Sequence, residues 1–250
     1  MAADAALHAV LKALELEAQV FAGFSAKEIA TFAAMLERIL SGMKPYFGTT
    51  NDVAIITTAG TGGLEAAVVN TLSPGDKVLV PQTGFFAERW SNTARAYGLE
   101  VEALATTDRC AVDPEAVGHV LAADTKHQIK AVMVVHNETS TGVTSNIPAI
   151  RAAIDAAKHP ALLMVDTISG LASIDYRHQA WGVDVTVSGS QKGLMLPPGI
   201  SFNALSPKAI EASKHANLPK SFWAWDEMLE INKTGYYPYT PNTNLMYGLS

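Results

Sequence analysis

The sequence predicts an α/β protein with a mostly parallel sheet covered by helices. Nearly continuous apolar runs occur at 130–136, 161–165 and 183–187, and such runs are typical of strands that are buried on both faces. Segments with helical spacing of apolar residues alternate with these runs, as expected for strands joined by crossover helices. Each run also ends in small or polar residues, where open α/β sheets place their ligands.

Composition narrows the class of protein. The chain has 250 residues, of which 48% are hydrophobic, enough for one large core or a domain with an appendage. The net charge is -6 and the basic residues are scattered, which argues against a nucleic-acid binder. Cys110 is the only cysteine, so an intramolecular disulfide and a thiolate zinc cluster are excluded. No metal site is expected.

The sequence shows no targeting or membrane segment. No run reaches the roughly 18 apolar residues that a membrane span needs, and no early basic cluster suggests a leader. We therefore expect a cytoplasmic location. The first 40 residues have helical spacing, interrupted at Gly23 and Ser25, and Ser25 with Glu28 forms a possible capping box.

A strand is expected at 52–58, followed by glycines at 60, 62 and 63 and by a helix over 64–72. This arrangement can present backbone N–H groups and a helix dipole to a phosphate. The spacing matches neither a Walker loop nor a dinucleotide fingerprint. On the residues alone, the glycines form either a phosphate site or a simple connection.

Further candidate residues follow the later strands. After a turn at 73–76 and a strand at 77–81, Phe86 could lie over a planar ligand or belong to the core. Helices are expected over 90–97, from Asp113 onward, and over 150–157. Asp166 directly follows the strand at 161–165, and it could cap a helix or contact a ligand.

Lys192 lies at the tip of the strand that begins at Val183. The next seven residues, 193–199, include two glycines and two prolines, so an irregular loop follows the lysine. A lysine held in such a loop can form a Schiff base if desolvation favours its neutral amine. An ordinary exposed lysine at the end of a strand is an equally good interpretation of these residues alone.

Several short motifs together resemble the class V, fold-type I aminotransferases, which use pyridoxal 5'-phosphate (PLP). The serine-glyoxylate and alanine-glyoxylate aminotransferases look most similar. The matching segments are AGTG at 59–62, TLSPGD at 71–76, HNETSTGV at 136–143, VDT at 165–167, SGSQKG at 188–193 and PPG at 197–199. The resemblance implies the seven-stranded large domain of that family at 46–250, after a divergent N-terminal helical segment at 1–45.

The resemblance also implies roles for individual residues. Lys192 would form the Schiff base with PLP and later remove the Cα proton. Asp166 would pair with the pyridine nitrogen and keep it protonated. Phe86 would stack on the ring, and Thr139 would hydrogen-bond to the ring hydroxyl.

The remaining implied contacts are to the cofactor's phosphate. Gly60 and Thr61 would bind it through backbone and hydroxyl donors, with Gln191 beside them. Tyr237 and Thr240 match a segment that reaches the phosphate of the neighbouring subunit in relatives. That match implies a homodimer with shared active sites. From the residues alone, a proline-rich surface loop is the preferred interpretation of this segment.

The implied reaction passes the amino group of a small amino acid, with serine preferred over alanine or aspartate, to glyoxylate. The products would be glycine and a 2-oxo acid. Cysteine desulfuration is disfavoured because Cys110 lies outside the motifs.

Relatives continue into a small C-terminal domain that supplies a carboxylate-binding arginine, and this chain is expected to lack both. Its arginines, such as Arg89 and Arg95, lie in segments to which the family pattern does not assign that role. The alternative is therefore a truncated PLP-binding domain without turnover.

Overall fold

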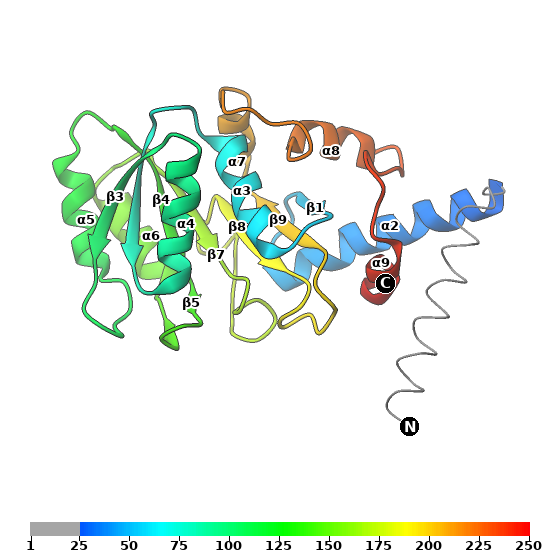
Figure 1. The fold of residues 1–250 in the computed structure, drawn as a ribbon, viewed down its shortest axis with the longest axis horizontal. Helices are drawn as coiled ribbons and strands as arrows, with labels where there is room; N and C mark the ends of the chain where they lie inside the picture. The colour runs from blue at the N-terminus through cyan, green and yellow to red at the C-terminus, as the bar shows by residue number, and fades with distance from the viewer. Residues whose placement is uncertain (1–25) are drawn as a thin grey trace.

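A seven-stranded sheet forms the centre of the molecule in the computed structural model, which describes residues 26–250 (Figure 1). The strand order is β1-β9-β8-β7-β4-β2-β3, and the pairs among β8, β7, β4, β2 and β3 are parallel. The strands are β1 (Val53–Ile56), β2 (Lys77–Gln82), β3 (Glu100–Ala105), β4 (Ile129–Val135), β7 (Leu162–Asp166), β8 (Val185–Gly189) and β9 (Ser201–Leu205). The predicted fold class is confirmed.

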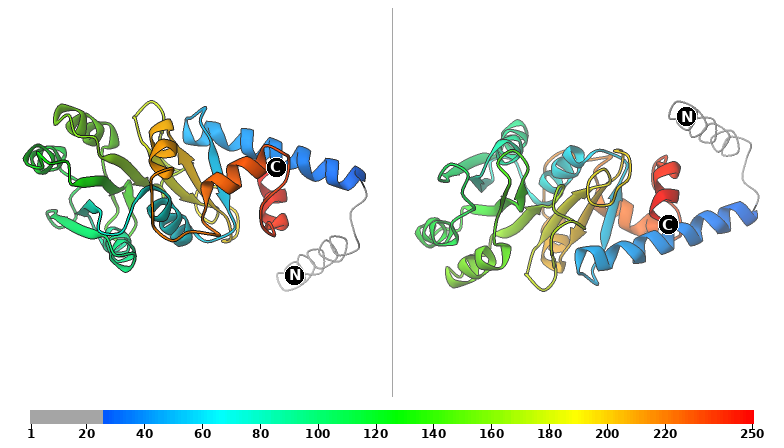
Figure 2. Two further views of the ribbon diagram at one scale, coloured as in Figure 1. Left: turned by 90° about the horizontal axis from the view of Figure 1, so that it is seen from above. Right: turned by 90° about the horizontal axis from the view of Figure 1, so that it is seen from below.

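Helices cover both faces of this sheet (Figure 2). One face carries α2 (Ala26–Phe47), α5 (Pro114–Ala123), α6 (Ile147–Ala156) and α9 (Thr243–Leu249). The other carries α3 (Gly60–Thr71), α4 (Phe85–Ala96), α7 (Pro207–Ser213) and α8 (Trp225–Asn232). A second, two-stranded sheet contains β5 (Asn137–Glu138) and β6 (Val143–Thr144).

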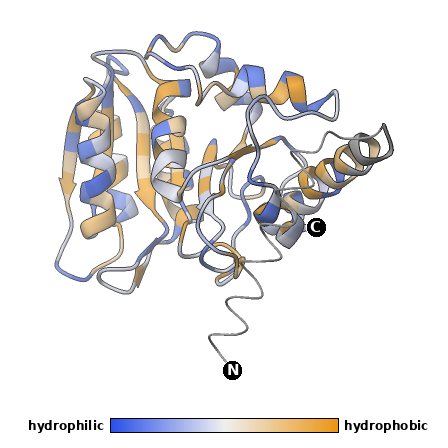
Figure 3. Cartoon of the chain, turned by 45° about the vertical axis from the view of Figure 1, so that its right-hand side comes forward, coloured by the Kyte–Doolittle hydropathy of each residue, from blue (hydrophilic) through white to orange (hydrophobic). Residues whose placement is uncertain are grey.

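The strands are apolar on both faces because the two helical layers each need a hydrophobic surface to pack against. In β4, Val132 and Val134 belong to one core cluster, whereas Ala131 and Met133 belong to the other. This alternation follows from the two-residue period of a strand. Figure 3 shows the resulting concentration of hydrophobic residues on the strands between the helices.

Three helices begin earlier than the sequence suggests. One is α6, which starts at Ile147 and not at residue 150. α3 starts at Gly60 and not at residue 64, so the glycines form its first turn. Small residues are required there, since a Cβ on Gly63 would lie 2.0 Å from the Ser201 hydroxyl. α4 starts at Phe85 and not at residue 90. Phe86 is therefore a residue of a helix N-terminus and not of a strand end.

Other expectations have mixed outcomes. Asp113 caps α5 as expected, accepting a hydrogen bond from the Glu115 N–H at 2.9 Å. The predicted domain boundary at 45/46 falls in the last turn of α2. Gly23, Ser25 and the rest of the first helical stretch lie outside the described residues. In residues 26–250, no helix is both long and apolar enough to cross a membrane.

A buried polar cluster supports the sheet near the end of α2. His178 has no exposed surface, and its Nδ1 lies 2.8 Å from the Thr186 hydroxyl. The Tyr176 hydroxyl shares the same Thr186 oxygen at 2.6 Å. Burial lowers the pKa of His178 to about 4, because the charged imidazolium would lose its hydration.

His178 makes stability fall in acid. Its pKa is lower in the folded protein than the ordinary 6.5, so the unfolded chain binds more protons between pH 6.5 and 4. The contribution of His178 to the free energy of unfolding should therefore be fully present above pH 6.5. About 3 kcal/mol of it should be lost by pH 4. We expect His178→Asn to reduce this loss in urea titrations across that range. His119→Asn, at an exposed site on α5, is the control, and equal slopes in both variants would contradict the assignment.

Candidate active site

A cleft of about 170 Å³ opens at the carboxyl edge of the sheet, beyond the ends of β4, β7 and β8. Seven predicted site residues line it: Gly60, Thr61, Phe86, Thr139, Asp166, Gln191 and Lys192. They come from five segments that are separated in the sequence. The parallel strands bring these segments to one edge, as the sequence predicts for open α/β sheets.

The N-terminus of α3 forms one wall of the cleft. The first N–H groups of a helix lack intrahelical acceptors and carry partial positive charge. The Gly62 N–H donates to the Ala59 carbonyl oxygen at 2.9 Å. α3 has no side-chain cap and no acidic residue in its first turn, so among the described residues the N–H groups of Gly60 and Thr61 are left for an anion. Gly60 is needed because an added Cβ would lie 2.5 Å from Ile168 Cδ1. This wall is well suited to a phosphate.

Gln191 lies next to this wall. Its Oε1 is buried and has no hydrogen-bond partner within the described residues. A Cβ on Gly189 would come within 3.1 Å of that oxygen and 3.6 Å of the Gly60 Cα. The end of β8 therefore brings Gln191 close to the start of α3, as expected for a residue beside the phosphate site.

Asp166 forms the floor of the cleft as the last residue of β7. Oδ1 accepts a hydrogen bond from the Ile168 N–H at 2.8 Å. Burial raises the pKa of this carboxyl to about 7, the Ile168 N–H opposes the rise, and the nearby charge of Glu138 adds to it. No ion pair involving Asp166 is found in residues 26–250. It caps no helix, and its contact with a ligand stays a prediction.

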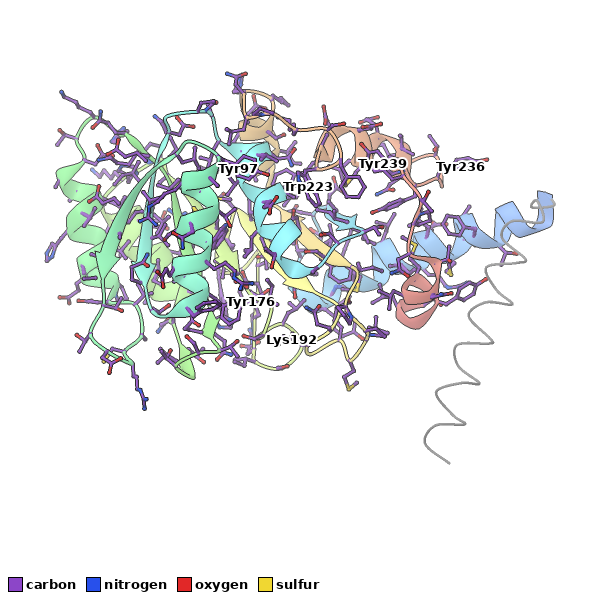
Figure 4. The ribbon with its side chains drawn as sticks, viewed as in Figure 1. Tyr97, Tyr176, Lys192, Trp223, Tyr236 and Tyr239 are labelled. Carbon is purple, nitrogen blue, oxygen red and sulfur yellow. The ribbon has the colours of Figure 1, made fainter. Side chains whose placement is uncertain are left out.

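Lys192 lies on the loop between β8 and β9, below the sheet in Figure 4. The antiparallel pairing of Gly189 with Ser201 closes the base of this loop. Gly193 fixes its position, since an added Cβ would lie 2.1 Å from the Leu171 carbonyl oxygen. Lys192 is nevertheless exposed, so the described residues of a single chain do not provide the desolvation that its sequence position suggests.

Phe86 and Thr139 are held by one residue that the sequence analysis missed. Glu138 is completely buried. Its Oε2 accepts hydrogen bonds from the N–H groups of Phe86 and Ala87 at 3.1 and 3.2 Å. Its Oε1 accepts from the N–H and the hydroxyl of Ser140 at 3.1 and 2.7 Å. The carboxylate thus ties the start of α4 to the turn that carries Thr139, and its charge favours the helix N-terminus.

Tyr237 and Thr240 do not line the cleft of their own chain. The Tyr237 hydroxyl donates to the carbonyl oxygen of Ile55, and burial raises the pKa of this phenol to about 12. Thr240 is exposed. The labelled neighbours Tyr236 and Tyr239 lie far from Lys192 in the view of Figure 4. A role for this segment at an active site therefore requires a second subunit, and it stays a prediction.

Seven other residues lining the cleft were not singled out as site residues from the sequence: Ala59, Leu64, Arg89, Val135, Asn137, Ile168 and Ser169. The Asn137 side chain donates to the Ser169 hydroxyl at 2.9 Å, and that hydroxyl donates to the Asn137 carbonyl oxygen at 2.8 Å. These bonds join the segments after β4 and β7. In the sequence, the position of Ile168, two residues after the aspartate that ends a strand, could have indicated an apolar contact to a ligand.

The chemistry of this donor set fits PLP. An unpaired buried carboxyl, Asp166, suits a protonated ring nitrogen. The apolar side chains of Phe86 and Ile168 suit a planar ring, and the N–H groups at the N-terminus of α3 suit a phosphate group. Lys192 supplies an amine at the same cleft. Among the described residues, no cluster of three His, Cys, Asp or Glu side chains could hold a metal ion.

The burial of Asp166 should destabilise the cofactor-free protein at neutral and alkaline pH. Its pKa is higher when folded, so this group favours the folded state most at low pH and costs up to about 4 kcal/mol above pH 7. Asp166→Asn keeps an acceptor for Ile168 and removes the charge. We expect the variant to be more stable than the parent at pH 8 and this advantage to shrink toward pH 4, measured by urea unfolding without PLP.

The control for that measurement is Asp108→Asn, at an exposed site. An Asp166→Asn protein that is no more stable than the parent at pH 8 would show that the buried carboxyl has a compensating partner.

Loss of the Glu138 charge should loosen the start of α4. In Glu138→Gln, the NH₂ group cannot accept a hydrogen bond, so one pair of donors is left without its acceptor. We expect a loss of about 2 to 3 kcal/mol in the free energy of unfolding and faster amide exchange at Phe86 and Ala87. Glu88→Gln changes an exposed acidic residue in the same helical turn and is the control. Unchanged exchange at both amides would contradict this role.

Comparisons with known proteins agree with the fold. The family model "Aminotransferase class-V" matches residues 3–220. An L-aspartate-glyoxylate aminotransferase from Paracoccus denitrificans is 46% identical over 220 residues, covering 88% of this chain and 56% of that protein. A serine-glyoxylate aminotransferase from Methylorubrum extorquens is 43% identical over 224 residues, covering 87% of this chain and 56% of that protein.

Solved structures show the same similarity. The structure of an alanine-glyoxylate aminotransferase from Nostoc sp. superimposes with a TM-score of 0.81 at 28% identity, covering 88% of this chain and 58% of that chain. An aspartate aminotransferase from Thermus thermophilus gives 0.80 at 33% identity, covering 88% and 60%. The chain thus spans about half the length of the curated relatives it matches. The matched family model and the shared fold establish that this chain belongs to the class V aminotransferases.

Proposed function

We propose that this chain forms the PLP-binding part of an aminotransferase that transfers an amino group from a small amino acid to glyoxylate. The observation that supports this best is the convergence of Asp166, Lys192 and the N-terminus of α3 on one cleft. These groups match the three chemically distinct parts of PLP: ring nitrogen, aldehyde and phosphate.

In this proposal, each residue has a physical task at the cleft. Asp166 holds a proton on the ring nitrogen, because a cation there relieves the cost of its own buried charge. The first N–H groups of α3, together with Thr61 and Gln191, hold the phosphate. Phe86 and Thr139 orient the ring. PLP, when bound, supplies an electron sink for the bond that breaks at the substrate Cα.

Lys192 is the proposed nucleophile and base. Its amine would hold the cofactor until a substrate amine replaces it. The freed amine would then accept the proton from the substrate Cα. The position of Lys192 at the mouth of the cleft, on a loop anchored by Gly193, allows both tasks. The buried floor around Asp166 meanwhile keeps water from the ring nitrogen.

Serine is our first choice of amino donor, with alanine and aspartate as alternatives, and glycine and a 2-oxo acid are the products. Relatives named for serine and for aspartate both exceed 40% identity over most of this chain. The cleft must therefore be tested with each donor.

We further propose that residues 46–250 form the PLP-binding domain, preceded by the helical segment 1–45, and that two copies share their active sites. In such a dimer, Tyr237 and Thr240 would contact the partner's cofactor phosphate. The exposure of Lys192 in the single chain supports this arrangement, since a partner could supply the burial that Lys192 lacks.

The test is a visible absorption titration of the protein with PLP, compared with Lys192→Ala. The parent should show a protein-bound band that serine removes and glyoxylate restores, whereas the variant should show only the spectrum of free PLP. Lys214→Ala changes an exposed lysine after α7 and should behave as the parent. A Lys192-dependent band that ignores every amino acid would support a PLP-binding domain without turnover. A band in Lys192→Ala equal to that of the parent would overturn the assignment.

A further inference from the structure

Arg89 lies where the cleft opens, although no sequence pattern assigns it a role. It lines the cleft together with Phe86 and Lys192, and it also lines the neighbouring depression between α3 and α4. On α4 it follows Phe86 by three residues and Phe85 by four, so all three side chains share one face of the helix. The same helix therefore carries an aromatic contact for the ring and a cation beside it.

Two aromatic rings hold the Arg89 guanidinium. Its Cζ lies 4.9 Å from the ring centroid of Phe85 and 5.8 Å from that of Phe86. The two rings meet edge to face, with centroids 5.4 Å apart. Phe85 is 52% exposed, which is unusual for so large an apolar side chain and leaves its face available for this contact. A guanidinium stacked on rings keeps the N–H donors in its plane free for a ligand.

Those donors have no protein partner in residues 26–250. Three other arginines do: Arg95 donates to Asn92 at 2.9 Å, and Arg151 and Arg177 pair with Asp155 and Asp175. Glu65 and Glu88 line the neighbouring depression, but neither forms an ion pair with Arg89. Arg89 is thus the one arginine lining the described cleft, it is held in place, and it is unpaired.

We propose that Arg89 binds a carboxylate of the substrate at the mouth of the cleft. This inference rests on the proposed aminotransferase function. A guanidinium can hold a carboxylate through two parallel hydrogen bonds, and every substrate of an amino-acid aminotransferase carries at least one carboxylate. The α3 N-terminus and Gln191 already serve the phosphate on another wall, so the charge of Arg89 is left for the substrate.

The test separates charge recognition from cofactor binding. The parent, Arg89→Gln, Arg89→Lys and the control Arg95→Gln are loaded with PLP and titrated with serine and with ethanolamine, which is serine without its carboxylate. β-Alanine, whose carboxylate lies one bond farther from the amine, is the third ligand. The PLP affinity of each variant is measured first, by titration of the Lys192-dependent band.

A second readout avoids the reaction altogether. Glycolate, a carboxylate that cannot react with the cofactor, is titrated calorimetrically into the same proteins, with ethylene glycol as its uncharged counterpart. An exposed charged pair predicts roughly a 10-fold loss of glycolate affinity in Arg89→Gln. Arg89→Lys should recover part of it, because a lysine retains the charge without the bidentate geometry.

The expected pattern is selective. Arg89→Gln should weaken the response to serine about 10-fold and leave that to ethanolamine and the PLP affinity unchanged, and Arg95→Gln should match the parent. A weakened response to β-alanine alone, with the response to serine unchanged, would overturn the proposal. Equal effects on serine and ethanolamine, or a loss of PLP affinity itself, would overturn the proposal while leaving the proposed function intact. Absence of any Lys192-dependent band would instead overturn the proposed function.

Discussion

The structure depends on the burial of two carboxylates at the carboxyl edge of the sheet. Glu138 is surrounded by four hydrogen-bond donors, so its charge stabilises the segments that it joins. Asp166 has a single donor, from Ile168, and no cation among residues 26–250. Both carboxyls are buried, yet only Glu138 is satisfied by the described protein. The difference assigns Glu138 to the scaffold and supports the proposal that Asp166 contacts a ligand.

The two carboxylates differ in what they cost the folded protein. An unpaired buried charge costs several kcal/mol, and the nearby Glu138 charge adds to the cost at Asp166. A scaffold that removed this charge would be more stable, and under the proposed function it would lose its affinity for a cationic ring nitrogen. Stability and ligand affinity are therefore opposed at this residue, as is common where a functional charge is buried.

The sequence predicts the fold and the contributing strand ends well, because nearly continuous apolar runs that alternate with helices leave few arrangements of the strands. It fails where tertiary contacts decide. Glycines occupy the first turn of α3 because Ile168 and Ser201 leave no room for a Cβ at Gly60 and Gly63, and α4 begins early because Glu138 caps it from 52 residues away. The role of Glu138 and the position of Arg89 depend on these contacts, so no local pattern reveals them. The exposure of Lys192 depends on which segments pack beside its strand and loop, and the local sequence does not show this.

The polarity of the cleft also changes from floor to mouth. At the floor, Asp166 is fully shielded, so electrostatic interactions there are strong and poorly screened. At the mouth, Lys192 and Arg89 are exposed, so their interactions in a single chain are weakened by water. A ligand or a partner surface that covers the mouth would exclude water and so strengthen the electrostatic interactions of both cations. Charge recognition at this site is therefore coupled to closure of the mouth, whereas the floor is preorganised in the single chain.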